Sequence, residues 1–278
     1  DYGSGAGSTI LVAEDVSMNM LLVRSILAAI VPGSTVLEAA DGARAVEAYM
    51  NNRYDLILMD MQMPVMDGME ATKRIRALEH GTGRRTPIVA LTAWVVKEEM
   101  DRAIEAGMDS YLTKPIDQWH LAAELARFGI AGRDRSLPST GHPASPGNTS
   151  GDSCPENLRA HFDHDAWLRR LGNDTKIAEE MLALCLADFP EKMEDLVRAA
   201  SARDVAGMGR IAHTMKGAAM TMHFEVLADL ALRLERAVHT EGMDADDLDI
   251  APIIAEWATV RSILQEQLRQ VSVRKDAV

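Results

Sequence analysis

The sequence predicts two domains of different fold class, an α/β domain followed by an all-α domain. In the first part of the chain, short apolar runs alternate with stretches of helical spacing, which is typical of a doubly wound parallel sheet. Residues 156–273 have only helical spacing, which predicts a four-helix bundle with short extra helices at its start. Between the two, residues 130–155 are rich in Ser, Gly and Pro and predict a flexible linker.

Four apolar runs predict strands of the first domain, because a short continuous run fits a strand that is buried on both faces. These runs are Thr9–Ala13, Tyr54–Met59, Pro87–Leu91 and Ser110–Thr113. The stretches between and after them predict helices near residues 18–30, 42–51, 69–78, 97–106 and 118–128. In the second domain, helices are predicted at residues 163–171, 175–188, 190–203, 205–222, 225–240 and 248–271, the last with a break around Pro252.

Polar side chains close the apolar runs of the first domain. They are Glu14 and Asp15, Asp60, Thr92 and Lys114. Because the carboxyl ends of parallel strands meet at one edge of a sheet, these five residues are expected to converge. Each one alone is an ordinary turn or cap residue, but together they predict a site with a shared chemistry.

The crowding of three carboxylates in this site predicts a hard cation with oxygen ligands, for which Mg²⁺ is the usual choice. Asp60 can then act as a nucleophile on phosphorus and form an aspartyl-phosphate. Lys114 and Thr92 would hold the phosphoryl oxygens that the metal does not reach.

Residues 9–129 resemble a receiver domain of two-component signalling. The run Asp60–Gly68 is similar to the loop after the family's phosphoacceptor, and Leu91-Thr92-Ala93 and Lys114-Pro115 also fit. The resemblance implies a five-stranded flavodoxin-like sheet. It also implies Mg²⁺ ligands at Glu14, Asp15, Asp60 and the backbone carbonyl of Gln62, and switch residues at Thr92 and Tyr111. Tyr111 reads equally well as a plain core aromatic.

Metal-dependent phosphatases and phosphomutases offer a rival interpretation, since they also use an aspartyl nucleophile at a strand end. Those enzymes carry a second Asp two residues later as general acid. Gln62 occupies that position here and cannot deliver a proton. A phosphoryl group on Asp60 is therefore expected to persist long enough to signal.

The helix predicted at residues 205–222 places one histidine opposite its apolar stripe. That stripe consists of Met208, Ile211, Ala212, Met215, Ala219 and Met222. His213 points about 155° away from its middle, with Lys216 about 60° from the imidazole and Gly209 and Gly217 about 40° to either side. Glycine in a helix interior costs about 1 kcal/mol against alanine, so this pair predicts that another protein's surface comes close to the ring.

The run Ile211–Gly217 resembles the phosphoacceptor motif of histidine-containing phosphotransfer domains, and Phe189–Glu191 and Leu230–Glu235 are similar to flanking pieces of that family. The resemblance implies that His213 accepts a phosphoryl group and that Lys216 and Gly217 assist. Met220 and His223 depart from the family, since many members carry small residues there. Met220 falls on the His213 face, where it is expected either to be an exposed apolar contact for a receiver or to narrow which receivers fit.

Two further groups of residues have simpler interpretations. His161 and His164, interleaved with Asp163 and Asp165, have metal-ligand spacing, but a helix-capping region is favoured. Cys154 and Cys185 provide no disulfide framework, which favours a reduced cytoplasmic setting.

Composition limits the partners. The net charge of −13 argues against nucleic acid and anionic membranes, no apolar stretch is long enough to span a bilayer, and no ATP-binding motif is present. The resemblance to the two families implies an upstream histidine kinase and a downstream response regulator receiver as partners. The arrangement resembles the cytoplasmic tail of a membrane-bound hybrid sensor histidine kinase, whose kinase core would lie upstream of Asp1.

The sequence therefore predicts a phosphorelay module in which Asp60 takes a phosphoryl group from the kinase and passes it to or from His213. Two alternatives stay open at this level. One is a phosphate sink, in which the receiver drains phosphoryl groups back from His213. The other is a docking module, in which modification of Asp60 exposes or covers the His213 surface.

Overall fold

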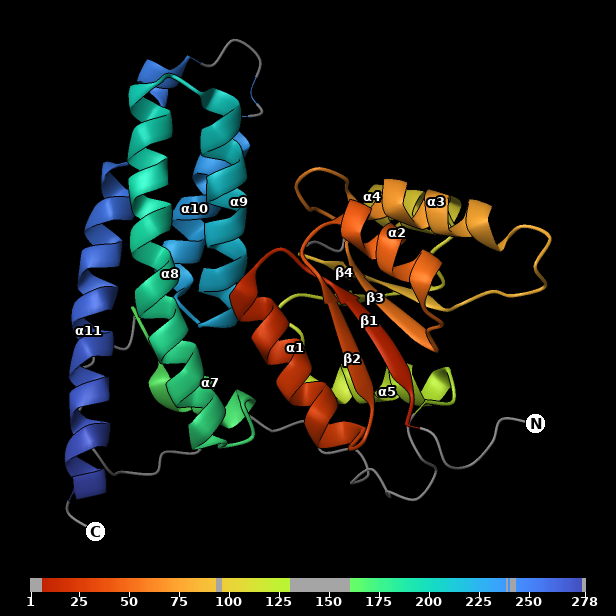
Figure 1. The fold of residues 1–278 in the computed structure, drawn as a ribbon. Helices are drawn as coiled ribbons and strands as arrows, with labels where there is room; N and C mark the ends of the chain where they lie inside the picture. Colours follow the sequence, from red (N-terminus) through yellow and green to blue (C-terminus); the bar gives the residue numbers. More distant parts are fainter. Residues whose placement is uncertain (1–6, 94–96, 131–160, 239, 241–243, 277–278) are drawn as a thin grey trace.

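The structure, a computed structural model, describes residues 7–93, 97–130, 161–238, 240 and 244–276, so the linker predicted at residues 130–155 falls almost wholly outside the described residues. An α/β domain stands beside a bundle of long helices (Figure 1). The strands are β1 Thr9–Ala13, β2 Thr35–Ala39, β3 Leu56–Asp60, β4 Ile88–Thr92 and β5 Ser110–Thr113. The helices of this domain are α1 Ser17–Ile30, α2 Gly42–Asn51, α3 Gly68–Glu79, α4 Lys97–Ala106 and α5 Gln118–Arg127.

The five strands form one parallel sheet in the order β2-β1-β3-β4-β5, which confirms the predicted fold class. The chain leaves β1 for β2 on one side and then returns to β3 on the other. Strand order therefore reverses between β1 and β3, and a ligand site is expected beyond the carboxyl ends of these two strands.

Both faces of the sheet are covered, because alternate residues of each central strand enter two different cores. Along β1, Ile10 and Val12 face α1 and α5, whereas Leu11 and Ala13 face α2 and α3. All four are fully buried. Burial on both faces explains why the central strands are continuous apolar runs in the sequence.

Strand β2 was not among the four predicted apolar runs. Its sequence, Thr-Val-Leu-Glu-Ala, contains two polar residues, and only its last residue is buried. As an edge strand it pairs with β1 alone, and its Glu38 forms an exposed ion pair with Arg24 of α1 at 3.3 Å. An edge position removes the need for a continuous apolar run.

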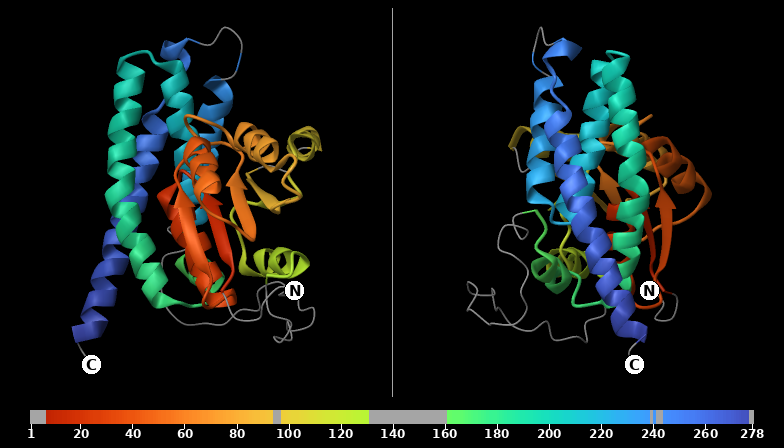
Figure 2. Two further views of the ribbon diagram at one scale, coloured as in Figure 1. Left: turned by 45° about the vertical axis from the view of Figure 1, so that its right-hand side comes forward. Right: turned by 90° about the vertical axis from the view of Figure 1, so that its left-hand side faces the viewer.

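The second domain consists of α7 His164–Arg170, α8 Thr175–Ser201, α9 Val205–Thr221, α10 Glu225–Val238, a 3₁₀ turn at Ala245–Asp247 and α11 Ala251–Asp276. Four of these helices are long and pack side by side as a bundle (Figures 1 and 2). None of the described helices combines the length and apolar character needed to cross a bilayer.

Two predictions about prolines in this domain are wrong. The helices expected at 175–188 and 190–203 form the single helix α8, with Pro190 inside it. Proline costs such a helix about 3 kcal/mol or more, but α8 buries Cys185 and Phe189 before Pro190 and Met193 after it on the same face. The break expected around Pro252 is also absent, because Pro252 lies in the first turn of α11, where its missing N–H is not needed.

Aromatic side chains fill the core of the bundle. Phe189 of α8 stacks on Trp257 of α11 with ring centroids 4.7 Å apart. Phe224 lies 6.2 Å from Phe189 and 5.2 Å from Phe162, and Phe162 in turn meets Trp167 of α7. Through these buried rings, the short helix α7 and the residue Phe162 before it pack against the long helices.

Helix α1 lies between the sheet and the bundle (Figures 1 and 2). It buries six consecutive residues, Met18–Val23, whereas a helix covered on one side would alternate buried and exposed positions. One face of α1 packs on the sheet, and the other packs on α8 and α9. The two domains therefore share one continuous apolar core through this helix.

The loop between β3 and α3 returns so closely to Asp60 that residue 68 has no room for a side chain. A Cβ on Gly68 would lie 2.0 Å from the carbonyl oxygen of Asp60. The loop is held there by a hydrogen bond from the Gly68 amide to the Met61 carbonyl and by Asp67, which caps α3 through the Glu70 amide.

We expect Gly68→Ala to lower the free energy of unfolding by about 3 kcal/mol, because backbone must move to admit the methyl group. The matched control is Gly33→Ala, where φ is +89° but nothing lies within 4 Å of the new Cβ. That variant should lose only the backbone term of about 1 kcal/mol. Urea unfolding of both variants measures the difference, and equal losses would show that the close approach is unimportant.

Candidate functional site

Three carboxylates meet at the point where strand order reverses. Glu14 and Asp15 directly follow β1, and Asp60 is the last residue of β3. Each can offer one carboxylate oxygen such that these atoms lie within 4.8 Å of one another. Glu14 and Asp60 are almost completely buried. The predicted convergence of these three residues is therefore what the structure shows.

Lys114 joins two of these carboxylates from the end of β5. Its Nζ lies 2.6 Å from Glu14 Oε2 and 2.6 Å from Asp60 Oδ2. Burial by itself would lower the pKa of Lys114, but the two carboxylates outweigh it and raise that pKa above its ordinary value. The Lys114 amide also donates to the Thr92 carbonyl at 2.7 Å, which places buried Thr92 beside it at the end of β4.

One ammonium does not neutralise three carboxylates. Burial, and then the charge of Glu14, raise the pKa of Asp60 to about 8, although Lys114 acts in the opposite direction. Asp15 shows the same effect: burial and Glu14 raise its pKa, and its Oδ1 atom is buried without a hydrogen-bond partner. Crowded oxygen ligands with an unsatisfied atom fit a hard cation, so the cluster could hold a metal ion.

Gln62 and Tyr111, the other two predicted site residues of this domain, are both exposed. The Gln62 amide donates to Asp60 Oδ1 at 3.3 Å, and Gln62 is exposed at the mouth of the site. Tyr111 points outward from β5 and is 39% exposed, so it is not a core aromatic in this structure. Its predicted role as a switch and the role of Gln62 as a metal ligand remain predictions.

His213 projects from α9 on the side opposite the core of the bundle. Asp204 caps this helix through the Gly207 amide at 2.8 Å. Five of the six predicted stripe residues are fully buried, and Ile211 is partly buried. The imidazole is only 20% exposed because the α/β domain lies against it.

Glu235 of α10 contacts both His213 and Lys216 on one face of α9. Its Oε1 lies 2.6 Å from His213 Nδ1, and its Oε2 lies 2.6 Å from Lys216 Nζ. Burial opposes ionisation, but the hydrogen bonds from His213 and Lys216 prevail and lower the pKa of Glu235 to about 2. An ionised carboxylate can only accept a hydrogen bond, so Nδ1 of His213 is the donor in this contact and Nε2 is the ring nitrogen that Glu235 does not engage.

Lys216 differs from its expected setting. The helix geometry placed it beside an exposed imidazole, yet its side chain is only 3% exposed. The buried ammonium is possible because Glu235 neutralises it. Glu235 was not among the functional residues predicted from the sequence. It lies in the run Leu230–Glu235, which resembles a flanking piece of histidine-containing phosphotransfer domains.

The two positions that frame His213, residues 209 and 217, are glycines for different structural reasons. A Cβ on Gly217 would lie 3.4 Å from Asn19 Nδ2 and 3.6 Å from Val16 Cγ2, so the surface that comes close there is α1 of the first domain. A Cβ on Gly209 would instead lie 2.8 Å from Val238 Cγ1 of α10. The prediction of an approaching protein surface is therefore wrong for Gly209, whose lack of a side chain allows α9 and α10 to pack.

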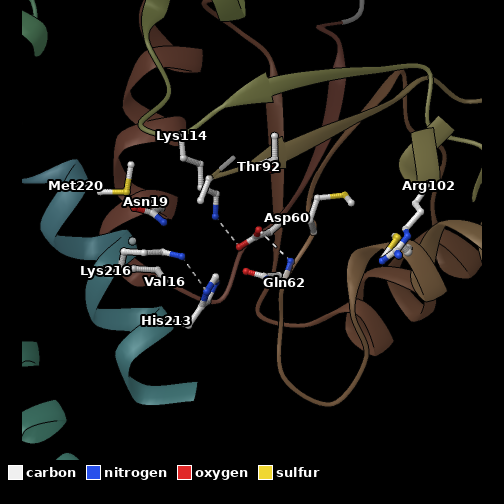
Figure 3. A pocket seen from close by; sticks show the side chains of 14 residues that line it. Val16, Asn19, Asp60, Gln62, Thr92, Arg102, Lys114, His213, Lys216 and Met220 are labelled. Atoms are coloured by element: carbon white, nitrogen blue, oxygen red, sulfur yellow. Dashed lines mark hydrogen bonds and ion pairs between the residues drawn. The ribbon is translucent and has the colours of Figure 1, made fainter. Parts of the chain in front are cut away.

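The two predicted sites face each other across one cavity of about 80 Å³. Figure 3 shows His213, Lys216 and Met220 on α9, with Asp60, Thr92 and Lys114 reaching toward them from the strand ends. His213 lies near enough to lower the pKa of Asp15 through its charge. Met220 lines this cavity together with residues of the α/β domain, and its predicted contact with a receiver remains a prediction.

His161 and His164 lie in a helix-capping region and contact carboxylates of their own domain. Asp163 caps α7 through the Ala166 amide at 2.9 Å, which confirms the capping interpretation. His161 Nδ1 lies 2.7 Å from Glu256 Oε1 of α11, and His164 lies beside Asp165. Cys185 is a free thiol in the bundle core, whereas Cys154 lies outside the described residues.

The low pKa of Glu235 predicts a specific pH dependence of stability. The ionised carboxylate contributes stability above its ordinary pKa of 4.5, and this contribution is lost as pH falls from 4.5 toward about 2. We therefore expect the wild-type melting temperature to fall more steeply over this range than that of Glu235→Gln. Thermal unfolding at a series of pH values checks this. In the control Glu70→Gln, which breaks an exposed ion pair with Arg74, the slope should match the wild type.

Comparison with known proteins agrees with this geometry. Residues 10–126 match the response regulator receiver domain, and residues 180–272 match the Hpt domain. The sensor protein GacS of Pseudomonas syringae pv. syringae is 33% identical over 265 residues, which cover 91% of this chain and 27% of GacS. The response regulator ORR41 of Oryza sativa subsp. japonica is 42% identical over 124 residues, or 44% of this chain and 94% of ORR41.

Among solved structures, the receiver domain of the sensor histidine kinase PA1611 from Pseudomonas aeruginosa PAO1 is 41% identical, with a TM-score of 0.40; the match covers 44% of this chain and 98% of that domain. The chain spans about a quarter of the length of the sensor kinases GacS and BarA, at 27% and 25%. With both domain families matched in this order, the chain belongs to the two-component phosphorelay proteins, as a response regulator receiver domain followed by an Hpt domain.

Proposed function

We propose that Asp60 of the receiver domain and His213 of the Hpt domain exchange a phosphoryl group within this chain. The observation that supports this is the shared cavity, which both side chains line together with Lys114 and Lys216. A phosphoryl group leaving one residue would meet the other without crossing bulk water. Such positioning, with charge neutralisation, is most of what phosphoryl transfer requires.

In the direction from aspartate to histidine, Nε2 of neutral His213 attacks the phosphorus of the aspartyl-phosphate. The new Nε2–P bond forms as the bond between phosphorus and the Asp60 oxygen breaks, and Asp60 leaves as a carboxylate with the bonding electron pair. The proton on Nδ1 stays in place. Ionised Glu235 stabilises the positive charge that develops on the imidazole, in the manner of the third group of a catalytic triad.

The charges around the cavity suit this exchange in both directions. Lys114 faces the acceptor carboxylate and neutralises the charge that appears on Asp60 when it leaves. The Thr92 hydroxyl is proposed to donate to a phosphoryl oxygen, with Tyr111 responding as the second switch residue. Lys216 orients Glu235 and, through it, His213.

We propose Mg²⁺ as the metal of the acidic cluster, with Glu14, Asp15, Asp60 and the Gln62 carbonyl as its ligands. The supporting observation is the set of crowded oxygen ligands, which includes an unpaired atom on Asp15. When bound, the ion would neutralise charge on the phosphoryl oxygens. Because Gln62 cannot act as a general acid, the aspartyl-phosphate should survive until His213 takes the phosphoryl group.

The chain is proposed to act as part of a hybrid sensor kinase, between an upstream histidine kinase and a downstream receiver. Its similarity to GacS over most of its length supports this. The Hpt domain is proposed to begin near residue 156, before the matched range, because Phe162 and Trp167 are buried against Phe224. The near symmetry of the exchange allows phosphoryl flow in either direction, including its use as a phosphate sink.

The relay is tested by incubating the chain with Mg²⁺ and radiolabelled acetyl phosphate. Wild type should carry a base-labile label on Asp60 and an acid-labile label on His213. Asp60→Asn should lose both, because His213 is reached only through Asp60, whereas His213→Gln should keep the base-labile label alone. In the control His161→Gln, which breaks the pair with Glu256 outside the cavity, both labels should remain. An acid-labile label in Asp60→Asn would contradict the internal route.

The metal site is tested by thermal unfolding. A ligand at 100 times its dissociation constant stabilises a protein by about 2.7 kcal/mol, so saturating Mg²⁺ should raise the wild-type melting temperature. Asp15→Asn should lose most of this increase. Without metal, the same variant should be at least as stable as wild type, because one of three repelling carboxylates is gone.

The control for the metal site is Asp117→Ala, which removes the cap of α5 through Trp119 and His120 and leaves the cluster intact. It should be less stable than wild type and yet gain as much from Mg²⁺. An equal gain in Asp15→Asn and wild type would show that the ion binds elsewhere.

A further inference from the structure

Among the described residues, side-chain hydrogen bonds join the Hpt domain to the receiver domain at two places. Thr221 Oγ1 of α9 donates to Asn19 Oδ1 of α1 at 2.5 Å, and Asn19 lines the cavity shared by Asp60 and His213. The Arg170 guanidinium of α7 donates to the carbonyl of Pro115, the residue after Lys114.

The contact through Asn19 continues to the acidic cluster. Asn19 Nδ2 donates to Glu14 Oε1 at 2.9 Å, and Glu14 Oε2 is paired with Lys114. Thr221, Asn19 and Glu14 are each 4% exposed or less. A buried chain of hydrogen bonds thus runs from α9 of the Hpt domain to the Glu14 carboxylate. Lys114, the ion-pair partner of Glu14, also pairs with Asp60.

The Thr221 hydroxyl completes this chain. The Asn19 amide turns its donating end to the Glu14 carboxylate, so its accepting end faces Thr221. The Thr221 hydroxyl supplies the donor that this buried oxygen needs. Without the hydroxyl, the buried oxygen of Asn19 would lose its partner, and a reversed amide would place that oxygen against the Glu14 carboxylate.

We propose that Asn19 and Thr221 are a positioning pair that makes this receiver domain specific for its own Hpt domain. Their hydrogen bond forms when the Hpt domain is seated with His213 facing Asp60, and it sets the orientation of Glu14 in that state. This rests on the proposed exchange between Asp60 and His213. An Hpt domain without a hydroxyl at this position would bury an unpaired amide and be rejected.

The test uses two full-length chains, so that each side of the contact changes separately. The donor carries His213→Gln and is labelled on Asp60 with acetyl phosphate. The acceptor carries Asp60→Asn and keeps His213. Transfer is measured against acceptor concentration, which separates the maximal rate from the apparent KM.

We expect Asn19→Ala in the donor or Thr221→Val in the acceptor to lower the maximal rate about tenfold, which is the size of one buried hydrogen bond. Because both substitutions remove the same bond, their combination should be no slower than the slower single variant. Thr221→Ser keeps the hydroxyl and should restore the rate. Thr259→Val, whose hydroxyl bonds only the Ala255 carbonyl of its own helix, should have no effect.

The outcomes separate this inference from the proposed function. If the rate losses of the two single variants add up in the combination, or if only the apparent KM changes, the pair contributes to binding affinity alone. Either result would overturn the inference. If no transfer occurs between chains, the test is made within one chain. The ratio of acid-labile to base-labile label at early times is compared between the parent chain and its Thr221→Val variant. An unchanged ratio would overturn the role of the Asn19–Thr221 pair and leave the proposed exchange intact. If His213 of the parent chain never acquires label, the proposed exchange itself fails, and the positioning role fails with it.

Discussion

Charge balance around Lys114 is the constraint on which the functional site depends. Parallel strands in this order bring the ends of β1, β3 and β5 together, and the residues at these ends are mostly acids. The Lys114 ammonium, in contact with Glu14 and Asp60, is the cation that lets two buried carboxylates remain side by side. One ammonium leaves an excess of negative charge, and that excess is why the cluster could hold a metal ion.

The Hpt domain contains the reverse arrangement of charges, with one carboxylate between two nitrogen groups. Here one carboxylate, Glu235, serves two nitrogen bases, the imidazole of His213 and the ammonium of Lys216. The arrangement keeps Lys216 charged although it is buried, and it leaves Nε2 of His213 as the free nitrogen. An acid-rich pocket and a nitrogen-rich helix face are complementary, which favours their contact across the shared cavity.

Seating of the Hpt domain against the receiver domain has a functional cost. The same contact that brings His213 to Asp60 covers the imidazole, which retains only 20% exposure. In the proposed relay a downstream receiver reaches the same Nε2 atom, which requires the two domains to separate first. The apolar contact that such a separation would break is supplied by helix α1, through its unbroken buried run Met18–Val23.

The sequence by itself determined the order and class of the domains, the convergence of the strand-end residues and the side of α9 on which His213 lies. Apolar periodicity shows which face of an element is buried, and topology rules place strand ends together. Strand β2 was missed, because an edge strand needs no continuous apolar run, and α8 was divided at Pro190, because local propensity takes no account of burial on both sides.

Only the tertiary structure decided which side chains meet across elements. Glu235 pairs with His213, Val238 fills the space at Gly209, and Thr221 meets Asn19 across a separation of 202 residues. Periodicity identifies faces but does not state which face packs on which. Contacts between helices depend on crossing angles and side-chain packing, and these are settled when the whole chain folds.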